Sequence, residues 1–380
     1  MYGPLVPATF TSRPNRFVVE CVREGEPTRA FLPNPGRLRE SLTPGTELLL
    51  ERAANPDRRL AWTAVGLRHR GAVIGLDTHR ANRLVEELLG SRRLPGLEEF
   101  RVVRREVPHG HSRFDFLLEG PGGLLYLEVK SCTQAGRRVG MFPDAASDRG
   151  RRHLEELAEL ADGGTATAVV FLVHSPTADL FLPDFHADLA FARTLLAVRD
   201  RVRLLPVALA LDEELRVAGP LRPLEIPWEV AERDASDRGT YLVQLHLPGD
   251  LRLEVGHLGP REFPAGHAVY VGSAMNGLAA RLGRHRRGTG RPHWHLDHLR
   301  REARFVEGWP LRSALRLECE LAGALAGLPG VRSVPGFGCS DCRCPSHLVL
   351  FAEDPRRNPA FQALLLHYRT DRLVGAPRVP

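Results

Sequence analysis

The first 76 residues place apolar side chains in short runs that are separated by turn-forming residues. Residues 17–22 and 47–50 are rich in valine and leucine, which is typical of strands. Between these two runs, Pro33-Asn34-Pro35-Gly36 has the composition of a turn. Short strands joined by tight turns predict a small OB-like β-barrel over residues 1–76.

Residues 77–225 alternate between helical periodicity and strand-like runs. In chain order, the expected elements are helix 81–89, strands 101–107, 112–119 and 124–131, helix 147–161, strand 165–174, helix 189–198 and strand 202–211. The helix over 147–161 is strongly amphipathic, and the strand over 165–174 has the apolar composition of a buried strand. The order α, β, β, β, α, β, α, β predicts a mixed α/β sheet.

The remaining third of the chain predicts a linker, a second domain and a tail. Residues 226–238 are charged and lack apolar periodicity, so we expect a linker there. A small α+β domain is expected over 239–352, and a tail over 353–380 with one short helix near 361–368. Inside the domain, the expected elements are strands 241–247 and 268–272, a helix from about 278, and a helix over 313–325.

Composition narrows the class of protein. A chain of 380 residues favours two or three domains, and 43% hydrophobic with 26% charged residues is the mix of a globular protein. No apolar run reaches the roughly 18 residues that a membrane helix needs, and the N-terminus lacks the pattern of a secretory signal. Cysteines number 6, too few for a disulfide scaffold, so we expect a reducing cytoplasm.

Charge is unevenly spread along the chain. The formal net charge is +6, and residues 239–352 hold 14 arginines against 9 acidic residues, a net of +5. Such a balance favours a polyanionic partner such as nucleic acid. Lysine and arginine together number 52, and a single one of these, Lys130, is lysine. A position that keeps lysine in so arginine-rich a chain is expected to need an ammonium group.

Two carboxylates and this lysine fall on neighbouring strands. Asp115 interrupts an apolar strand, and Glu128 and Lys130 lie two residues apart on one face of the next strand. If the hairpin folds symmetrically about Pro121-Gly122, facing residue numbers add to 243, so that Asp115 faces Glu128 and Arg113 faces Lys130. Facing carboxylates repel unless a cation such as Mg²⁺ lies between them. The alternative is a solvent-facing hairpin in which Lys130 neutralises both acids.

The second domain has its own polar set. Tyr241 opens one expected strand, Tyr270 closes another, and Arg281 and His285 share a helical face. Glu318 falls among apolar residues of the helix expected over 313–325. A carboxylate there needs a partner, which is either a metal ion or, as the alternative, an ion pair with a cation such as Arg281.

Cysteines gather near the end of this domain. Cys339, Cys342, Cys344 and His347 have the spacing of metal ligands, and Cys319, His293 and His295 are further candidates. Thiolates and imidazoles are the ligands that zinc prefers. Unliganded cysteines in a tight loop are the alternative.

Residues 1–225 resemble the SfsA family, the sugar fermentation stimulation proteins. The matching stretches are Leu-Pro-Asn-Pro-Gly-Arg-Leu at 32–38, Arg-Arg-Glu-Val at 104–107, Ser-Arg-Phe-Asp-Phe-Leu-Leu at 112–118, Glu-Val-Lys-Ser at 128–131 and Phe-Pro-Asp-Ala at 142–145, followed by Arg149-Gly150 and His153. That family is similar to the PD-(D/E)XK nucleases, preceded by an OB-like barrel, and is described as DNA-binding.

The resemblance implies roles for the first set of residues. Asp115 and Glu128 would bind Mg²⁺ or Mn²⁺, and Lys130 would be catalytic. Glu86 or Glu87, on the first helix, would add a ligand. The candidates for the DNA side are Asp144, Arg149 and His153, which follow the motif, together with Arg13, Arg16, Arg37 and Arg113. A solvated helix face is the alternative for Arg149 and His153.

Residues 239–352 resemble the GIY-YIG nuclease-like domains, and more closely an uncharacterised branch of them. The motifs are Tyr-Val-Gly-Ser-Ala at 270–274, His-Trp-His-Leu-Asp at 293–297 and Phe-Gly-Cys-Ser-Asp-Cys-Arg-Cys at 337–344. The resemblance implies that Tyr241 and Tyr270 line a site, that Arg281 holds phosphate and His285 assists, and that Glu318 binds one metal ion. Thr240 replaces the middle isoleucine, and the two tyrosine motifs lie farther apart than is usual.

Two hypotheses follow from the sequence. One is a Mg²⁺-dependent nuclease that cleaves DNA through Asp115, Glu128 and Lys130, with a second nuclease-like site around Glu318. The other is a non-catalytic DNA-binding regulatory protein on nuclease scaffolds. A cleavage assay with a divalent metal distinguishes them.

Overall fold

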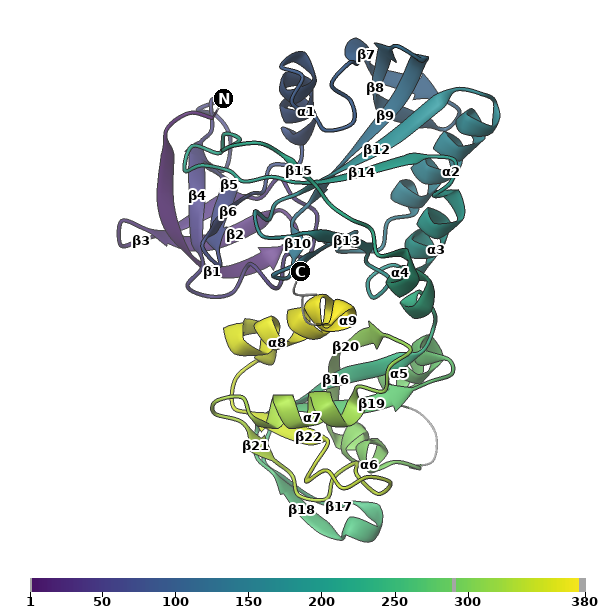
Figure 1. Cartoon of the computed structure of the whole chain (residues 1–380). Helices are drawn as coiled ribbons and strands as arrows, with labels where there is room; N and C mark the ends of the chain where they lie inside the picture. The colour runs from purple at the N-terminus through teal and green to yellow at the C-terminus, as the bar shows by residue number, and fades with distance from the viewer. Residues whose placement is uncertain (1, 289–291, 376–380) are drawn as a thin grey trace. The chain divides into compact units, whose positions relative to one another are not determined.

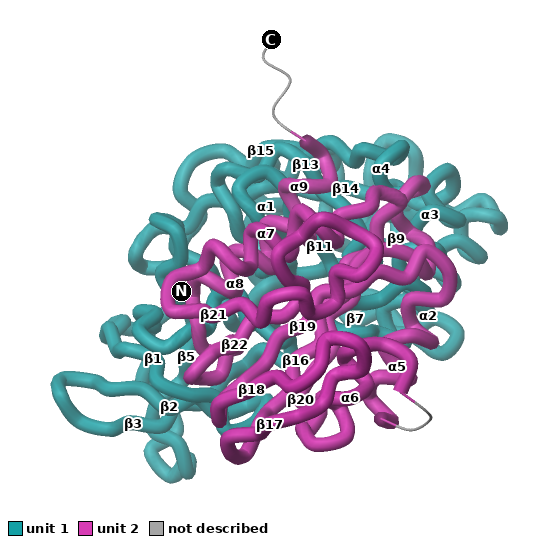
Figure 2. Tube along the Cα trace, turned by 90° about the horizontal axis from the view of Figure 1, so that it is seen from below, with its two compact units in different colours: residues 1–231 teal, residues 232–380 magenta. Residues whose placement is uncertain are grey.

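A computed structural model of the chain describes residues 2–288 and 292–375. It divides into two compact units, residues 1–231 and 232–380, which Figure 2 colours separately. Figure 1 labels the helices and strands of each unit. Among the described residues, no helix has both the length and the apolar character needed to cross a membrane.

The first unit begins with a closed barrel, as the strand pattern predicted. Its strands are β1 (Leu5–Asn15), β2 (Val18–Arg23), β3 (Glu26–Phe31), β4 (Glu47–Arg52), β5 (Trp62–His69) and β6 (Ala72–Gly75). They run in the order β3-β2-β1-β4-β5-β6, and a parallel pairing of β3 with β5 closes the barrel. Phe10, Val19 and Leu48 are among the buried side chains that fill it. The OB-like barrel is therefore confirmed.

A six-stranded mixed sheet follows the barrel, in the order β15-β14-β12-β9-β8-β7. Its strands are β7 (Arg101–His109), β8 (Ser112–Gly120), β9 (Gly123–Cys132), β12 (Ala166–Val173), β14 (Arg203–Ala208) and β15 (Arg222–Pro223). Neighbours β7, β8 and β9 are antiparallel, whereas β9, β12 and β14 are parallel. The mixed α/β sheet expected from the sequence is confirmed.

Helices cover both faces of this sheet (Figure 1). They are α1 (Ala81–Gly90), α2 (Asp148–Asp162) and α3 (Leu189–Val198). Val85 and Leu88 of α1 pack with one set of alternating strand residues, which includes Leu127. Leu154 of α2 and Phe191 of α3 pack with the other set. Because successive strand residues face opposite sides, Glu128 and Lys130 share the face that α2 covers.

The β8–β9 hairpin has the predicted register. Phe116 faces Leu127 and Gly120 faces Gly123, so facing residue numbers add to 243. The regular ladder ends at the Phe116 pair, and beyond it the carboxylate of Asp115 accepts the backbone N–H of Val129 at 2.7 Å. Neither of the expected pairs beyond that point, Asp115 with Glu128 and Arg113 with Lys130, is part of the ladder, and the exposed Arg113 side chain pairs with Glu106 at 2.8 Å.

A loop of the barrel reaches the edge of the sheet domain. It contacts Asp144, which lies just after β11 (Val139–Phe142). This strand forms a small sheet with β10 (Gln134–Ala135) and β13 (Leu180–Pro183). The backbone N–H groups of Arg37 and Leu38 donate to the Asp144 carboxylate, and burial, with the nearby Glu40 and Asp184 charges, raises its pKa to about 6. Gly36 lies so close that an added Cβ would fall 2.1 Å from Asp144 Oδ2.

The second unit is a five-stranded sheet in the order β20-β16-β19-β22-β21, with a separate β17–β18 hairpin. Its strands are β16 (Gly239–Leu247), β17 (Leu251–Glu254), β18 (Pro260–Phe263), β19 (Gly266–Ala274), β20 (Arg304–Arg312), β21 (Arg332–Ser333) and β22 (Leu348–Phe351). Helices α5 (Leu278–Arg287) and α6 (His295–Glu302) pack on one face, and α7 (Glu318–Ala326) and α8 (Pro359–Arg369) on the other.

Three segments differ from their sequence-based description. Helix α4 (Trp228–Asp234) occupies much of the expected linker, and the Asp234 carboxylate is fully buried where it accepts the backbone N–H of Ala314 at 2.8 Å. Helix α8, with α9 (Asp371–Val374), gives the expected tail a place in the core through Phe361 and Leu365. Residues 376–380 of that tail lie outside the described residues. Helix α7 begins at Glu318, five residues later than expected.

The contact between Gly36 and Asp144 leads to a prediction for Gly36→Ala. The new methyl group would displace a carboxylate that two backbone N–H groups hold in place. Overpacking of this kind costs about 1–3 kcal/mol, which a urea-denaturation midpoint measures. The control is Gly122→Ala, because a Cβ there meets no atom within 4 Å. Equal midpoints for the two variants would contradict the close contact.

Candidate functional site

Asp115 lies in β8 at a point where its charge is disfavoured. Its Oδ1 accepts a hydrogen bond from the Asn82 side-chain amide at 2.6 Å, and its Oδ2 accepts the backbone N–H of Val129 at 2.7 Å. Burial, followed by repulsion from Glu128, raises the pKa of Asp115 to about 7, although these hydrogen bonds act in the opposite direction. The carboxyl is therefore poised to lose its proton near neutral pH.

Glu128 is the more deeply buried partner, with 3% of its surface exposed. Its Oε1 accepts hydrogen bonds from Lys130 Nζ at 2.5 Å and from His153 Nδ1 at 2.6 Å. Burial alone would raise its pKa, but Lys130 and His153 outweigh burial and hold the pKa below its usual value. Its Oε2 is buried without a hydrogen-bond partner, so one carboxylate oxygen remains for a ligand.

The single lysine of the chain stands beside this pair. Lys130 has 14% of its side chain exposed, and its ammonium forms the ion pair with Glu128. A compact ammonium reaches the carboxylate along the strand face that the two residues share, where a guanidinium fork would be bulkier. The ion pair of Lys130 with Glu128, which belongs to the alternative of a neutralised hairpin, is present. The solvent-facing part of that alternative is wrong, because α2 covers this face.

Helix α2 extends the set by two residues. Arg149 Nε donates to His153 Nε2 at 3.3 Å, which makes Nδ1 of the same ring the donor to Glu128. His153 has 2% of its surface exposed, whereas Arg149 is exposed. The four-residue spacing predicted that these side chains share a helical face, and the structure places them in a line that leads from solvent to Glu128.

Helix α1 contributes an asparagine that sequence reasoning missed. Asn82 contacts Asp115, whereas Glu86 pairs with Arg105 at 3.1 Å and Glu87 pairs with Arg83 at 3.9 Å. In the described part of the chain, neither glutamate joins Asp115 and Glu128 in a group of three ligand atoms. In the sequence, Asn82 lies one helical turn before Glu86 and so falls on the same helical face. As an amide, it is not recognised when only carboxylates are considered as ligands.

A cavity of about 380 Å³ opens along α1 of the same unit, and neither Asp115 nor Glu128 lines it. Ser131 and His174 line it, with a hydrogen bond of 3.1 Å between Ser131 Oγ and His174 Nε2. Burial lowers the pKa of His174 to about 4, so the ring is neutral at pH 7. Ser131 follows Lys130 in β9, and successive residues face opposite sides of a strand, so this cavity is distinct from the carboxylate pair.

The arginines expected at the DNA side fall into two groups. Arg16, Arg37 and Arg113 are exposed. The guanidinium of Arg13 instead donates to the backbone carbonyls of Gly36 and Arg37, both at 2.7 Å, and burial lowers its pKa. Arg13 therefore holds the loop that contacts Asp144, and the expectation that it binds phosphate is not supported by its geometry.

In the second unit, both tyrosines and His285 come together. The Tyr241 hydroxyl lies 3.0 Å from His285 Nε2, and the Tyr241 and Tyr270 rings are 6.4 Å apart between centroids. Gly272 faces Tyr241 across the β16–β19 pair, and an added Cβ there would fall 2.5 Å from the Tyr241 hydroxyl. Burial raises the pKa of Tyr241 to about 12 and lowers that of His285 to about 4.

Arg281 joins this group from helix α5. Its guanidinium carbon lies 4.2 Å from the centroid of the Trp294 ring, and that of Arg284 lies at the same distance. Arg281 also hydrogen-bonds the Tyr241 side chain, which lowers the pKa of Tyr241 against the larger effect of burial. An arginine held over an aromatic face keeps its planar fork oriented.

Glu318 has other partners than those expected. It is the first residue of α7, and the expected apolar stripe around it does not form because Ala314 and Leu315 lie outside the helix. Ser273 Oγ donates to its Oε2, and its Oε1 lies 3.3 Å from His347 Nδ1. Burial would raise the pKa of Glu318, but His347 and Ser273 lower it further. The alternative of an ion pair with Arg281 does not match this geometry.

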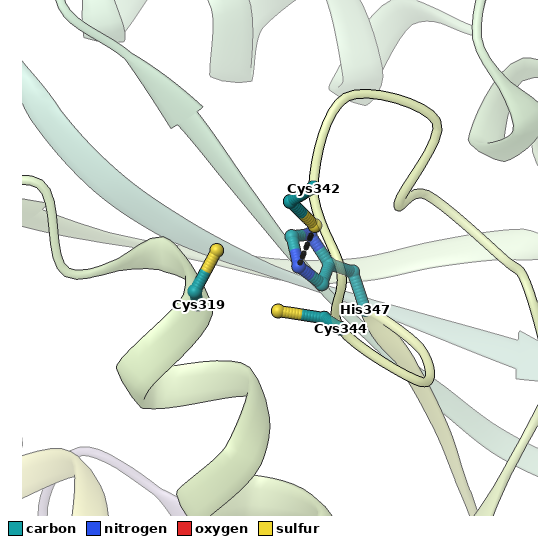
Figure 3. Close-up of side chains that lie close together, drawn as sticks. All are labelled: Cys319, Cys342, Cys344 and His347. Carbon is teal, nitrogen blue, oxygen red and sulfur yellow. Dashed lines mark hydrogen bonds between the residues drawn. The ribbon is translucent and has the colours of Figure 1, made fainter.

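The candidate zinc ligands are only partly those expected. Figure 3 shows that Cys319, Cys342, Cys344 and His347 converge, and their ligand atoms lie within 4.8 Å of one another. Among the described residues, Cys339 is not part of this group. His295 Nδ1 instead accepts the Gly338 N–H at 2.9 Å, and His293 donates its backbone N–H to Asp297. Cys319, a further candidate by sequence, takes the place of Cys339.

Known proteins match both units. A model of the "SfsA N-terminal OB domain" matches residues 12–76, and one of the "Sugar fermentation stimulation protein RE domain" matches residues 79–215. A sugar fermentation stimulation protein homolog of Moorella thermoacetica is 43% identical over 193 residues, which cover 50% of this chain and 83% of that protein. The chain belongs to the sugar fermentation stimulation protein (SfsA) family.

Other SfsA proteins support the same assignment. The homolog of Chloroflexus aurantiacus is 41% identical over 197 residues, which cover 52% of this chain and 76% of that protein. The structure of Pyrococcus furiosus SfsA in complex with Ca²⁺ has a TM-score of 0.55 at 30% identity, and covers 60% of this chain and 97% of that one. The second unit matches a "Domain of unknown function DUF123" over residues 240–369.

The raised pKa of Asp115 predicts how stability depends on pH. An unfolded aspartate ionises near about pH 4, and folded Asp115 at about 7. Its contribution to stability is thus complete below about pH 4 and is lost as pH rises through about 7. In metal-free buffer, Tm is expected to decrease less between about pH 5 and 8 in Asp115→Asn than in the unchanged chain. Glu119→Gln, which removes an exposed acid of the same strand, should not. Identical slopes for Asp115→Asn and the unchanged chain would contradict the shift.

Proposed function

We propose that this SfsA protein is a divalent-metal-dependent nuclease that hydrolyses phosphodiester bonds in DNA. Its principal centre is Asp115, Glu128 and Lys130, within a domain of PD-(D/E)XK type. The observation that carries the proposal is a pair of neighbouring carboxyl groups: a half-buried Asp115 with a pKa near 7 and a buried Glu128 with an unpartnered oxygen. A structural ion pair needs neither feature.

The residues fit a hard divalent cation such as Mg²⁺ or Mn²⁺. Asp115 and Glu128 Oε2 would hold it, and the amide of Asn82 stands beside Asp115. Such a cation prefers one or two carboxylates plus water and phosphate oxygens. The relative from Pyrococcus furiosus was solved in complex with Ca²⁺, which takes the same class of ligand. When bound, a divalent ion supplies charge neutralisation at phosphate and a more acidic water.

The protein's own groups order this centre. Lys130 and His153 both donate to Glu128 Oε1, so the carboxylate is turned with Oε2 away from them. Asn82 and the Val129 N–H fix Asp115 in the same way. With both acids oriented, the Lys130 ammonium provides the positive charge that phosphate oxygens need as negative charge builds up on them.

Exposed cations supply the DNA-binding part of the proposal. Arg149, on the surface of α2, donates to His153, which in turn donates to Glu128. Arg16 and Arg37 are exposed on the barrel, and arginine binds phosphate in a bidentate manner. The second unit, with Tyr241, Arg281 and His285 in contact, is a candidate for an additional GIY-YIG-like centre. Glu318, the metal ligand that the resemblance implies, instead faces Ser273 and His347 with its two oxygens.

Removing either acid of the principal centre should stop cleavage. We expect Asp115→Ala and Glu128→Ala to lower the rate on plasmid and linear DNA by at least about 100-fold, because several kcal/mol of charge stabilisation is lost. DNA binding should stay equal or become tighter, since a repulsive negative charge is removed. Mg²⁺-dependent cleavage, together with a gel-shift assay of the same variants, measures both effects.

Glu87→Ala is the matched control for these variants. It removes one carboxylate from an exposed position that pairs only weakly with Arg83, so it should cleave at the rate of the unchanged chain. Unchanged rates in both acid variants would refute the principal centre. Metal-independent DNA binding without cleavage in the unchanged chain would instead establish the non-catalytic regulatory alternative.

The arginines of the barrel predict a salt dependence. Binding should weaken steeply with salt, and Arg16→Ala and Arg37→Ala should each reduce the slope of log K against log salt by about 1. Arg101→Ala is the control, because Glu119 already pairs with that exposed cation. Fluorescence anisotropy across a salt series measures the slopes. An affinity that does not change with salt would argue against a DNA partner.

A further inference from the structure

Four soft ligands meet in the second unit, whereas the principal carboxylate pair belongs to the first. Helix α7 supplies Cys319, and the segment before β22 supplies Cys342, Cys344 and His347 (Figure 3). Their ligand atoms lie within 4.8 Å of one another, and Cys342 Sγ is 3.4 Å from His347 Nε2. Zinc bonds of about 2.3 Å to sulfur and 2.0 Å to nitrogen place tetrahedral ligands about 3.5–3.8 Å apart. Small side-chain rotations close the remaining gap.

The orientation of His347 is that of a metal ligand. Its ring is buried, with Nε2 toward Cys342 and Nδ1 3.3 Å from Glu318 Oε1. A histidine that binds metal through one nitrogen usually presents the other to a carboxylate, which fixes the ring and makes the ligand more basic. Ser273 donates to the other oxygen of Glu318. Glu318 therefore lies at ion-pair distance from the ring nitrogen that a metal bound at Nε2 would leave free.

The loop that carries three of the four ligands has no regular secondary structure that would hold its middle in place. Residues 334–347 contain no helix or strand. Backbone hydrogen bonds hold the loop at its ends: Gly336 N–H donates to Pro345 at 2.9 Å, and His347 N–H donates to Phe337 at 2.8 Å. The ligands Cys342 and Cys344 lie between these bonds. A metal ion bound there would tie the loop to the first turn of α7.

We propose that Cys319, Cys342, Cys344 and His347 bind one structural zinc ion. A Cys₃His set fills all four positions of a tetrahedral zinc site, so none remains for substrate. The proposal goes beyond the nuclease function and does not depend on it. It also explains the position of Glu318, because this carboxylate orients His347 and joins the zinc-bound loop to Ser273 in β19, the strand that carries Tyr270.

Metal content of the full-length chain tests the site. The protein, purified under reducing conditions, should hold one zinc per chain, and Co²⁺ in its place should give the intense near-ultraviolet band of thiolate ligands. Cys342→Ser and Cys344→Ser should lose the zinc. Cys339→Ser is the matched control, because this neighbouring cysteine lies outside the group and should keep the full zinc content. Loss of zinc from the Cys339 variant alone would overturn the ligand set.

Thiol alkylation keeps the test valid if a cysteine variant fails to fold. In the unchanged chain, Cys319, Cys342 and Cys344 should resist alkylation until a chelator removes the metal. Cys339 should react at the same rate before and after chelation. Equal reactivity of the three ligand cysteines before and after chelation would refute the proposal. None of these readings involves DNA cleavage.

Glu318→Gln tests the supporting carboxylate separately. The amide can still contact His347 but carries no charge, so zinc should remain bound with an affinity lowered by about 10–100-fold, the range for loss of such a partner. Glu320→Gln is the control, since that exposed acid of the same helix pairs with the half-buried Arg372 at 2.8 Å. A competing chelator titration measures both affinities. An unchanged affinity in Glu318→Gln would remove Glu318 from the zinc site.

Discussion

The structure of the first unit brings two acidic side chains together away from water, with Glu128 buried and Asp115 half-buried. Removing a carboxylate from water costs several kcal/mol unless nearby groups compensate for the loss of hydration. Asp115 receives this compensation from α1 and from the backbone of β9, and Glu128 receives it from Lys130 and from His153 on α2. Both helices and the hairpin must therefore meet at one place. One oxygen of this pair, Glu128 Oε2, is left buried without a hydrogen-bond partner.

Local rules were enough to predict this hairpin. A turn at Pro121-Gly122 and the alternation along two strands fix the register from Phe116 facing Leu127 to Gly120 facing Gly123. The ladder ends one pair before Asp115 and Glu128, and the Asp115 carboxylate reaches β9 through the Val129 N–H instead. The barrel was predictable for the same reason, since its strands are short and joined by tight turns. The roles of Asn82 and Arg13 were not predictable, because each depends on a partner more than twenty residues away.

The second unit shows the limit of periodicity more clearly. Residues 313–325 have the composition of one helix, yet the chain turns at Ser313, whose hydroxyl donates to the buried Asp234 at 3.2 Å. The helix is thereby delayed to Glu318, which moves this carboxylate from an apolar stripe to a helix start. The same helix start places Cys319, the next residue, close to Cys342 and Cys344. The spacing of cysteines near the end of the domain favoured Cys339 as the fourth ligand. Spacing along the chain cannot show that α7 brings Cys319 to the same place.

The loop at Gly36 has a consequence for how such proteins can be divided or recombined. The barrel and the sheet domain match separate family models, which suggests interchangeable parts. The buried acid of the sheet domain, Asp144, nevertheless takes its backbone donors from Arg37 and Leu38 of the barrel. A sheet domain expressed without its barrel would expose an acid that lacks these donors, and a foreign barrel would have to supply them. Evolution is therefore expected to inherit the two parts as one piece.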